Sequence, residues 1–313
     1  MNPSVSVVIP VFNGTNFLTE AINSVLSQTF TDYEVLVVDD GSTDGTWEII
    51  QSYGDRIRGF RKPNGGVASA LNLGIKEMRG RWFAWLSHDD LWLPEKLERQ
   101  VAFLKANSQF MACYSDFIII NDKGERLHVI DTPWYPREQA IRELFRGVYI
   151  NGSTIFIERS CFDQVGLFSE KWRYNQDTQM WLRLLRHFEI GRVSEKLVKQ
   201  RVHGAQESRN VKRHKSETLE MFKEVFNEIQ LKGLPPYLSS YTHDPSTLAM
   251  MHTWFGESMA YSQKLFLFAY QQYVLALRIF PSWRNPAWYK IIMNTLWMSY
   301  WLIRRSIQLL LKK

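Results

Sequence analysis

A short apolar run that leads directly into two adjacent carboxylates is the feature that most constrains this chain. Residues 82–86 are apolar, and Ser87, His88, Asp89 and Asp90 follow them. A buried strand that ends in carboxylates places oxygen ligands at the edge of a sheet, where open α/β folds bind their ligands. Mg²⁺ and Mn²⁺ prefer such oxygens, usually one or two carboxylates together with substrate phosphates. A surface turn that caps the following helix is the alternative interpretation.

The same arrangement occurs once more, earlier in the chain. Residues 35–38 are apolar, and Asp39, Asp40 and a turn rich in glycine, serine and threonine follow them. The opening apolar run, residues 5–12, also ends in loop-forming residues. This repetition favours a binding site at the edge of a sheet over two unrelated turns.

Apolar runs of strand length alternate with helical patterns up to about residue 95. The expected helices are residues 17–26, 47–53, 68–78 and 95–106, and the expected later strands are residues 111–120, 154–158 and 197–202. Such alternation predicts an α/β fold with a mostly parallel central sheet, right-handed crossovers and flanking helices.

The last third of the chain has a different pattern, because strand signals stop after Ser208. Helical patterns follow over residues 217–231, 246–279 and 288–311, and the last two are rich in aromatic residues. We therefore expect one α/β domain over residues 1–215 and a helical C-terminal extension over residues 216–313.

Several motifs stand in a fixed order along the α/β part. They are residues 8–13, 38–44, 64–75, 86–90, 175–183 and 201–203. This ordered set resembles the family 2 glycosyltransferases over about residues 4–210. The resemblance implies a GT-A fold and an inverting transfer of a sugar from a nucleotide diphosphate donor to a hydroxyl of a glycan or lipid-linked acceptor.

The resemblance assigns the nucleotide site to residues that end strands or open helices. They are Pro10, Phe12, Asn13, Asp39, Asp40, Gly66, Asn72, Ser87 and His88. Phe12 would offer a face for stacking on the base, although an ordinary core aromatic is the alternative. Asp39 would accept a hydrogen bond from a pyrimidine ring, and Asp40 would support the same loop. For Asn72 we expect a role in shaping the site through hydrogen bonds.

The resemblance also implies a divalent cation, Mn²⁺ or Mg²⁺, held against the diphosphate. Asp89 is the expected direct ligand, and Asp90 would stand behind it or face the acceptor. Ser87 occupies a position where the family commonly has aspartate, so one carboxylate of that pattern is missing. His203 is the second expected ligand, since a neutral imidazole binds Mn²⁺.

An inverting transfer needs one general base to deprotonate the acceptor hydroxyl. Asp177 stands at the family's base position, with Gln176 before it and Trp181 after it. An acidic residue favoured by the dipole of a helix is the alternative for Asp177. Gln176 and Trp181 are expected on the acceptor side or in support of the base, and packing is the favoured role for Trp181.

The net charge of +6 indicates an anionic partner. No nucleic-acid-binding motif accompanies the basic segment over residues 192–215, so a diphosphate or an anionic lipid surface is the preferred partner and nucleic acid is not. Two cysteines and no secretory segment at the N-terminus indicate a cytoplasmic enzyme.

The C-terminal residues predict attachment to a membrane surface. The apolar run over residues 291–303 is roughly 20 Å long as a helix, short of the ~30 Å of a bilayer core. Trp288, Trp297, Tyr300 and Trp301 suit a membrane interface. We expect peripheral attachment to the inner face of the cytoplasmic membrane. The alternative is packing on the α/β domain or on a second subunit of an oligomer.

Three functions compete at this point. The first is an inverting glycosyltransferase that builds a cell-surface polysaccharide or glycolipid. The second is a sugar-nucleotide pyrophosphorylase, but residues 13–16 lack the glycine-rich basic loop of such enzymes. The third is a non-catalytic nucleotide-sugar-binding protein of the same fold, and the presence of both Asp89 and Asp177 argues against it.

Overall fold

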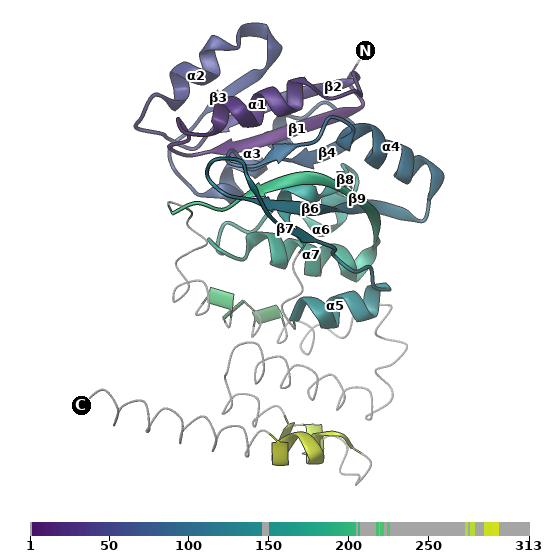
Figure 1. The fold of residues 1–313 in the computed structure, drawn as a ribbon. Helices are drawn as coiled ribbons and strands as arrows, with labels where there is room; N and C mark the ends of the chain where they lie inside the picture. The colour runs from purple at the N-terminus through teal and green to yellow at the C-terminus, as the bar shows by residue number, and fades with distance from the viewer. Residues whose placement is uncertain are drawn as a thin grey trace, which may run out of the picture. The chain divides into compact units, whose positions relative to one another are not determined.

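The computed structural model describes residues 2–145, 150–204 and 206, and shorter pieces further along the chain. These pieces are residues 217–218, 220–221, 224–225, 273–274, 276–278 and 285–293. Contacts divide the chain into two compact units, residues 1–140 with 149–223 and residues 141–148 with 224–313. The first unit contains the sheet, whose strands Figure 1 labels. Every residue predicted for the site also belongs to this unit.

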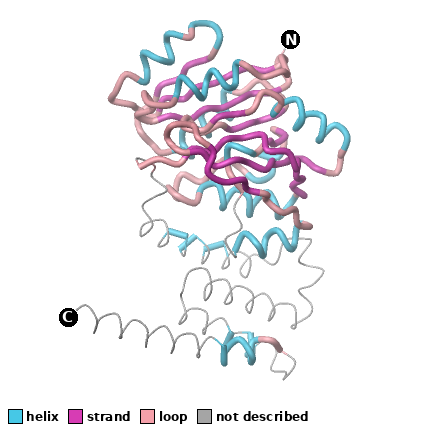
Figure 2. Tube along the Cα trace, viewed as in Figure 1, coloured by secondary structure: helices cyan, strands magenta, loops and turns pink. Residues whose placement is uncertain are grey.

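The strands of the first unit form one sheet. They are β1 (Val5–Val11), β2 (Tyr33–Asp39), β3 (Arg58–Arg61), β4 (Trp82–Trp85), β5 (Leu91–Trp92), β6 (Phe110–Ile120), β7 (Arg126–Ile130), β8 (Phe156–Glu158) and β9 (Glu189–Arg201). The sheet has nine strands in the order β3-β2-β1-β4-β8-β6-β9-β5, and β7 pairs with β6. Figure 2 shows these strands gathered at the centre with helices around them.

Helices connect most of these strands. They are α1 (Leu18–Leu26), α2 (Thr46–Ser52), α3 (Val67–Glu77), α4 (Lys96–Ala106), α5 (Arg137–Phe145), α6 (Cys161–Val165) and α7 (Gln176–His187), with short 3₁₀ turns η1 (Gly54–Arg56) and η2 (Gly152–Thr154). The amphipathic spacing of α1 buries Leu18, Ala21, Ile22 and Val25. The four helices predicted in the first part of the chain are confirmed, with ends that differ by no more than one residue.

The predicted mostly parallel sheet is also confirmed. β1 pairs parallel with β2 and β4, β2 pairs parallel with β3, and β6 pairs parallel with β9 along most of its length. β8 is antiparallel to both β4 and β6. Because β8 reverses the direction twice, β6 and β9 run the same way as β1 to β4. The carboxyl ends of these parallel strands therefore lie at one edge of the sheet.

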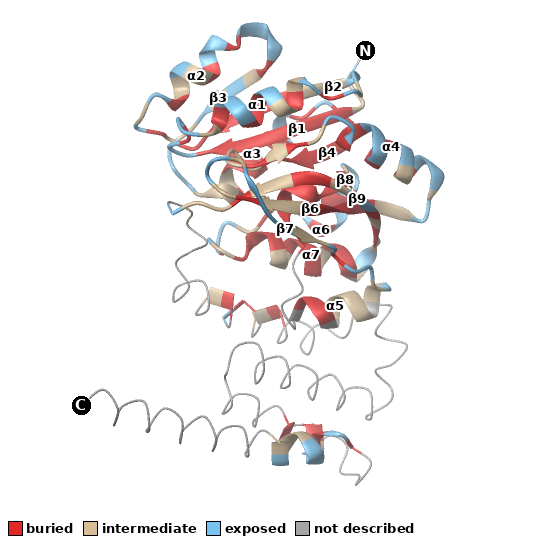
Figure 3. Ribbon diagram, viewed as in Figure 1, coloured by how far each residue is buried: buried red, intermediate tan, exposed pale blue. Residues whose placement is uncertain are grey.

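The central strands are buried on both faces. β1 is coloured as buried in Figure 3. Each of its residues is buried, and Pro10 is one of them. Pro10 lacks an N–H, and the β4 ladder along β1 extends only to Val8, so Pro10 lies beyond that ladder. Such strands belong to sheets covered on both sides, which explains why their sequences read as continuous apolar runs.

The structure departs from the sequence-based prediction where strands are short or charged. Residues 154–158 begin as η2 and become β8 only at Phe156, and residues 197–202 are the end of the much longer β9. Helices predicted over residues 217–231, 246–279 and 288–311 lie largely outside the described residues. In the part of the chain that the structure describes, no helix has both the length and the apolar character needed to cross a membrane.

Candidate active site

Asp39 ends β2 and is fully buried. Its Oδ1 accepts a hydrogen bond of 2.8 Å from the backbone N–H of Ser42. Its Oδ2 lies 3.2 Å from Nε of Arg61, yet no described group donates a hydrogen bond to it. A buried carboxylate oxygen without a donor is costly, and a ligand with an N–H group would satisfy it.

Asp40 fixes the loop that precedes α3. It accepts hydrogen bonds from Nζ of Lys62 at 2.6 Å and from the backbone N–H groups of Gly65 at 3.0 Å and Gly66 at 2.7 Å. Gly66 has a φ of 86°, which a side chain would strain. Asp40 therefore shapes the glycine loop that precedes α3.

Phe12 lies one residue beyond β1 and is 41% exposed, so its side chain is not part of the core. The next residue, Asn13, has a φ of 51° and bonds to the turn after β2. Its Oδ1 accepts from the N–H of Thr43 at 2.9 Å, and its own N–H donates to Oγ of Ser42 at 2.8 Å. The ends of β1 and β2 thus form one connected rim with an exposed aromatic ring.

Asn72 lies on α3 and is buried. Its Nδ2 donates to the carbonyl of Phe168 at 2.9 Å and to Oε1 of Glu170 at 3.0 Å, while its Oδ1 accepts from the N–H of Phe168 at 2.8 Å. These bonds attach the segment before α7 to α3. Asn72 acts here by shaping the structure around the site.

The second acidic turn depends on residues from distant parts of the chain. Asp90 is buried; its Oδ2 accepts from Oγ of Ser153 at 2.6 Å and its Oδ1 from the N–H of Arg201 at 2.9 Å. Oγ of Ser153 also accepts from the N–H of Ser87 at 3.0 Å. Burial, with the nearby charge of Asp89, raises the pKa of Asp90 well above its usual value. Asp90 therefore holds the second acidic turn against η2 and the end of β9.

Asp89 projects toward the residues that follow β9. Its Oδ2 lies 3.1 Å from Nε2 of His203 and 3.0 Å from Nε2 of Gln206. Both Asp89 and His203 are mostly buried, with 13% and 11% of their side chains exposed. The structure therefore brings together the two residues predicted as metal ligands, and it adds Gln206, which no sequence motif indicated.

Arg201 is a buried cation at the start of the motif over residues 201–203, and its position in that motif predicted no role for it. Its Nε donates to the carbonyl of Asp89 at 3.0 Å, and its Nη2 donates to Oε2 of Glu20 on α1 at 2.7 Å. Its guanidinium lies 4.3 Å from the ring centroid of Phe17, and that ring contacts His203 at 4.9 Å between centroids. Arg201 therefore joins α1, the second acidic turn and His203.

His88 has a half-buried side chain that lies next to Gly14 in the loop after β1. A Cβ at Gly14 would lie 2.8 Å from the His88 ring, so only glycine leaves room for it. Burial lowers the pKa of His88, which keeps the imidazole neutral at pH 7.

Asp177 is the second residue of α7 and is 9% exposed. Burial raises its pKa to about 6. The hydrogen bond of 2.6 Å that it accepts from the N–H of Thr178 acts in the opposite direction and lowers the pKa by less. A pKa in this range suits a general base near neutral pH. Among the described residues, Asp177 shares no hydrogen bond or ion pair with either acidic turn.

The neighbours of Asp177 have different environments. Oε1 of Gln176 is buried without a hydrogen-bond partner in the described structure. Trp181 is fully buried, donates from Nε1 to the carbonyl of Ile150 at 3.0 Å and meets Phe168 edge-on. Trp181 is thus a core residue.

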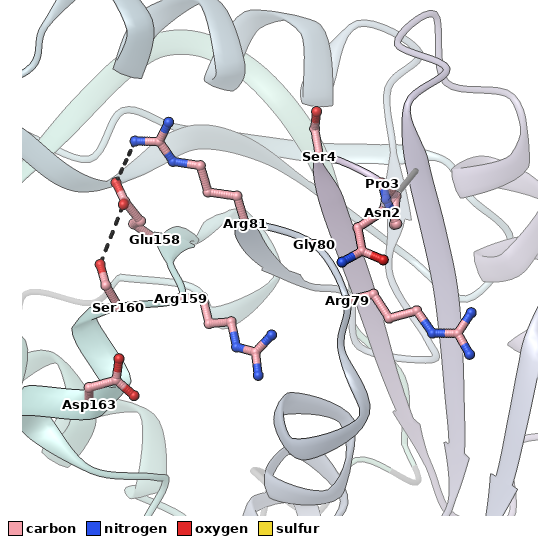
Figure 4. Close-up of a pocket in the computed structure, with 10 residues that line it drawn as sticks. All are labelled: Asn2, Pro3, Ser4, Arg79, Gly80, Arg81, Glu158, Arg159, Ser160 and Asp163. Atoms are coloured by element: carbon pink, nitrogen blue, oxygen red, sulfur yellow. Dashed lines mark hydrogen bonds and ion pairs between the residues drawn. The ribbon is translucent and has the colours of Figure 1, made fainter.

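A separate hollow of about 550 Å³ lies at the opposite edge of the sheet (Figure 4). Its lining comes from the residues before β1 and before β4 and from the end of β8 with the residues that follow, including Arg79, Arg81, Glu158 and Arg159. Arg81 pairs with Glu158 at 3.2 Å. None of the predicted site residues lines this hollow.

Comparison with known proteins gives a family match and several relatives. Residues 6–166 match the family described as Glycosyl transferase family 2. The uncharacterized glycosyltransferase RT0329 of Rickettsia typhi is 42% identical over 209 residues, which cover 66% of this chain and 66% of that protein. Among the Rickettsia relatives, the matched part spans between 32% and 66% of their length.

The names of two further similar proteins include a nucleotide sugar. The UDP-Glc:alpha-D-GlcNAc-diphosphoundecaprenol beta-1,3-glucosyltransferase WfgD of Escherichia coli is 30% identical, covering 61% of this chain and 73% of that protein. The crystal structure of S. aureus TarS 1-349 in complex with UDP-GlcNAc has a TM-score of 0.65 and 17% identity, covering 95% of this chain and 91% of that one. This second likeness is one of fold, and it supports the GT-A architecture.

Proposed function

Because this chain belongs to glycosyl transferase family 2, we propose that it transfers a sugar from a nucleotide diphosphate donor to a hydroxyl of a glycan or lipid-linked acceptor, with inversion at the anomeric carbon. The observation that carries the proposal is that Oδ2 of buried Asp39 accepts no hydrogen bond from a described group, while Phe12 at the end of the neighbouring strand has an exposed ring. A pyrimidine base has an N–H group that can donate to Oδ2 of Asp39, and it has a flat face on which the ring of Phe12 can stack. The UDP-GlcNAc bound to TarS makes a uridine nucleotide the first candidate.

We propose Asp89 and His203 as the residues that hold a divalent cation. Their side-chain atoms already converge within 3.1 Å, and a carboxylate with an imidazole suits Mn²⁺, while the carboxylate alone suits Mg²⁺. The described residues contain no cluster of three or more His, Cys, Asp or Glu side chains, so phosphate oxygens of the donor would complete the coordination. When bound, the cation would supply positive charge against the leaving diphosphate.

Asp177 is the proposed general base. The acceptor oxygen forms its bond to the anomeric carbon as the bond from that carbon to the diphosphate oxygen breaks, and the hydroxyl proton passes to the carboxylate of Asp177. The raised pKa of about 6 keeps Asp177 ionised at neutral pH and still basic enough to hold the proton.

The proposed acceptor side includes a membrane surface. In the second unit, residues 287–293 are helical and Trp288, Tyr289 and Ile292 are 52%, 59% and 58% exposed. Spacing of one and four residues places them on one face of the helix. Exposed aromatic and aliphatic residues on one helical face suit the membrane interface, and such attachment would hold the enzyme near a lipid-linked acceptor.

The donor assignment is tested by binding and hydrolysis. UDP-glucose, UDP-GlcNAc, a TDP-sugar and a GDP-sugar are titrated into the full-length protein with Mn²⁺, with Mg²⁺ or with EDTA, and slow hydrolysis is followed. We expect metal-dependent binding of a pyrimidine donor. Asp39→Asn should weaken that binding, while Asp55→Asn, a matched change at an exposed aspartate, should not. Binding without hydrolysis in every case would favour the non-catalytic binding protein.

The membrane assignment is tested separately with vesicles. Full-length protein and the double variant Trp288→Ser, Ile292→Ser are sedimented with anionic phosphatidylglycerol vesicles. Leu127→Ser, at a 48% exposed position of β7 in the first unit, is the control. Equal and negligible sedimentation of all three proteins would contradict the attachment.

A further inference from the structure

A single carboxylate holds the three residues that lead into α7. Oε1 of Glu217 accepts from the N–H of Tyr174 at 2.6 Å, from the N–H of Asn175 at 2.9 Å and from Nδ2 of Asn175 at 3.0 Å. Its Oε2 accepts from the N–H of Arg173 at 2.9 Å. Four bonds to one ionised group, made from more than forty residues away, form a strong local restraint.

The start of α7 needs such a restraint. Asn175 is the N-cap residue of α7, but its side chain makes no capping bond to the helix. Its Oδ1 instead accepts from Oγ1 of Thr218 at 2.8 Å in a buried contact. Glu217 and Thr218 therefore perform from a distant segment the anchoring that a capping side chain usually performs, and a negative charge is favourable at this end of a helix.

Asp177 depends on this anchoring because, among the described residues, its carboxylate bonds only within residues 177 and 178. It accepts from the adjacent Thr178, at 2.6 Å from the N–H and 3.4 Å from Oγ1. Neither bond fixes the direction in which the first turn of α7 points. That direction follows from the backbone of residues 173–175, which Glu217 holds.

We infer that Glu217 is a positioning residue for the reaction, which anchors the entry of α7 so that the carboxylate of Asp177 faces the acceptor hydroxyl. This inference rests on the proposed base role of Asp177. The negative charge of Glu217 also adds to the stronger effect of burial in raising the pKa of Asp177.

The test compares Glu217→Gln and Glu217→Ala with Glu220→Gln in the full-length protein. Glu220 is an exposed glutamate three residues further on, so it undergoes the same loss of charge without the four bonds. The readouts are kcat and donor KM for hydrolysis of UDP-glucose and UDP-GlcNAc, the pH profile of kcat/KM, the carboxyl titration of Asp177 by NMR, and hydrogen exchange of residues 173–178.

For Glu217→Gln we expect kcat to fall about 10-fold, and for Glu217→Ala about 100-fold, as for a small misplacement of a catalytic group, with donor KM unchanged. In the pH profile of kcat/KM, the midpoint of the acidic limb should move to lower pH in Glu217→Gln, because Asp177 loses one negative neighbour. Exchange at residues 173–178 should increase in both variants. Glu220→Gln should match the wild type in every measurement.

Unchanged exchange and an unchanged Asp177 titration in Glu217→Gln would overturn the inference. The inference would also be overturned if the Glu217 variants lost folding stability, donor binding and kcat to the same extent, because that result would show a merely structural role. If the wild type hydrolyses none of the donors, the proposed function fails, and the exchange and titration measurements still decide whether Glu217 positions Asp177.

Discussion

The two acidic turns have the same sequence pattern but are held in different ways. Asp39 and Asp40 bond to groups within residues 39–66, mostly backbone N–H groups of their own turn and of the glycine loop before α3. Asp89 and Asp90 bond to Ser153, Arg201, His203 and Gln206, which lie between 63 and 117 residues away.

This difference separates a preformed part of the site from an assembled part. The first turn is complete once β1, β2 and the glycine loop have folded. The second turn needs η2, the end of β9 and the residues after it. We therefore expect substitutions around the second turn to affect turnover more than substitutions around the first, and to act from greater distances in the sequence.

The largest effect is expected at Asp89, the carboxylate of the second turn that faces His203. Asp89→Asn removes the charge that would hold the cation, which is worth several kcal/mol, on the order of 10⁴-fold in transfer rate. Circular dichroism should show an intact fold, and Asp55→Asn should transfer normally. Turnover close to wild type in Asp89→Asn would show that Asp89 takes no part in the mechanism. It would also contradict the expectation that the second turn affects turnover more than the first.

The next effect is expected at Asp177, which belongs to neither turn. Asp177→Asn should lower the transfer rate on the order of 10²- to 10⁴-fold, with donor binding nearly unchanged. The wild-type rate should fall as pH drops through about 6, because protonated Asp177 cannot accept a proton. If donor binding were lost in a folded Asp177→Asn protein, Asp177 would belong to the donor side.

The same substitution has a second consequence, for stability. Burial raises the pKa of Asp177 above its unfolded value, so ionisation destabilises the fold as pH rises from about 4 to about 6. At pH 7.5, Asp177→Asn should be more stable by up to about 2–3 kcal/mol, and near pH 4 the two proteins should be alike. Urea denaturation at both pH values measures this difference.

A smaller effect is expected at Ser153, which supports the second turn from η2. Ser153→Ala leaves a buried carboxylate oxygen of Asp90 and the N–H of Ser87 without partners, which costs about 1–3 kcal/mol of folding stability. Turnover should fall as well, because Ser87 and Asp90, which lose these hydrogen bonds, lie on either side of Asp89 in the sequence. Ser52→Ala, at an exposed serine, is the control. An unchanged rate would mean that the second turn is as self-sufficient as the first.

The contrast between the turns also explains what the sequence predicted. Asp39, Asp40 and their glycine loop form a local motif, so the order of residues alone indicates their arrangement. The roles of Ser153 and Gln206 depend on which distant residues the sheet brings together, and no local pattern indicates that. Arg201 had a signal, the Arg-x-His spacing, but its bonds to Glu20 and Asp89 follow from the placement of α1 beside the end of β9.

The smallest effect is expected at Lys62, which neutralises Asp40 in the first turn. Lys62→Met removes the 2.6 Å bond from Nζ to Asp40 but keeps the aliphatic stem, and the N–H groups of Gly65 and Gly66 still bond to the carboxylate. We expect a loss of about 1 kcal/mol in stability and a change in turnover of no more than about threefold. Lys76→Met, at an exposed position of α3, is the matched control. A loss of turnover as large as that of Ser153→Ala would contradict the view that the first turn is preformed by its own backbone, because it would show that this turn also depends on a single side chain.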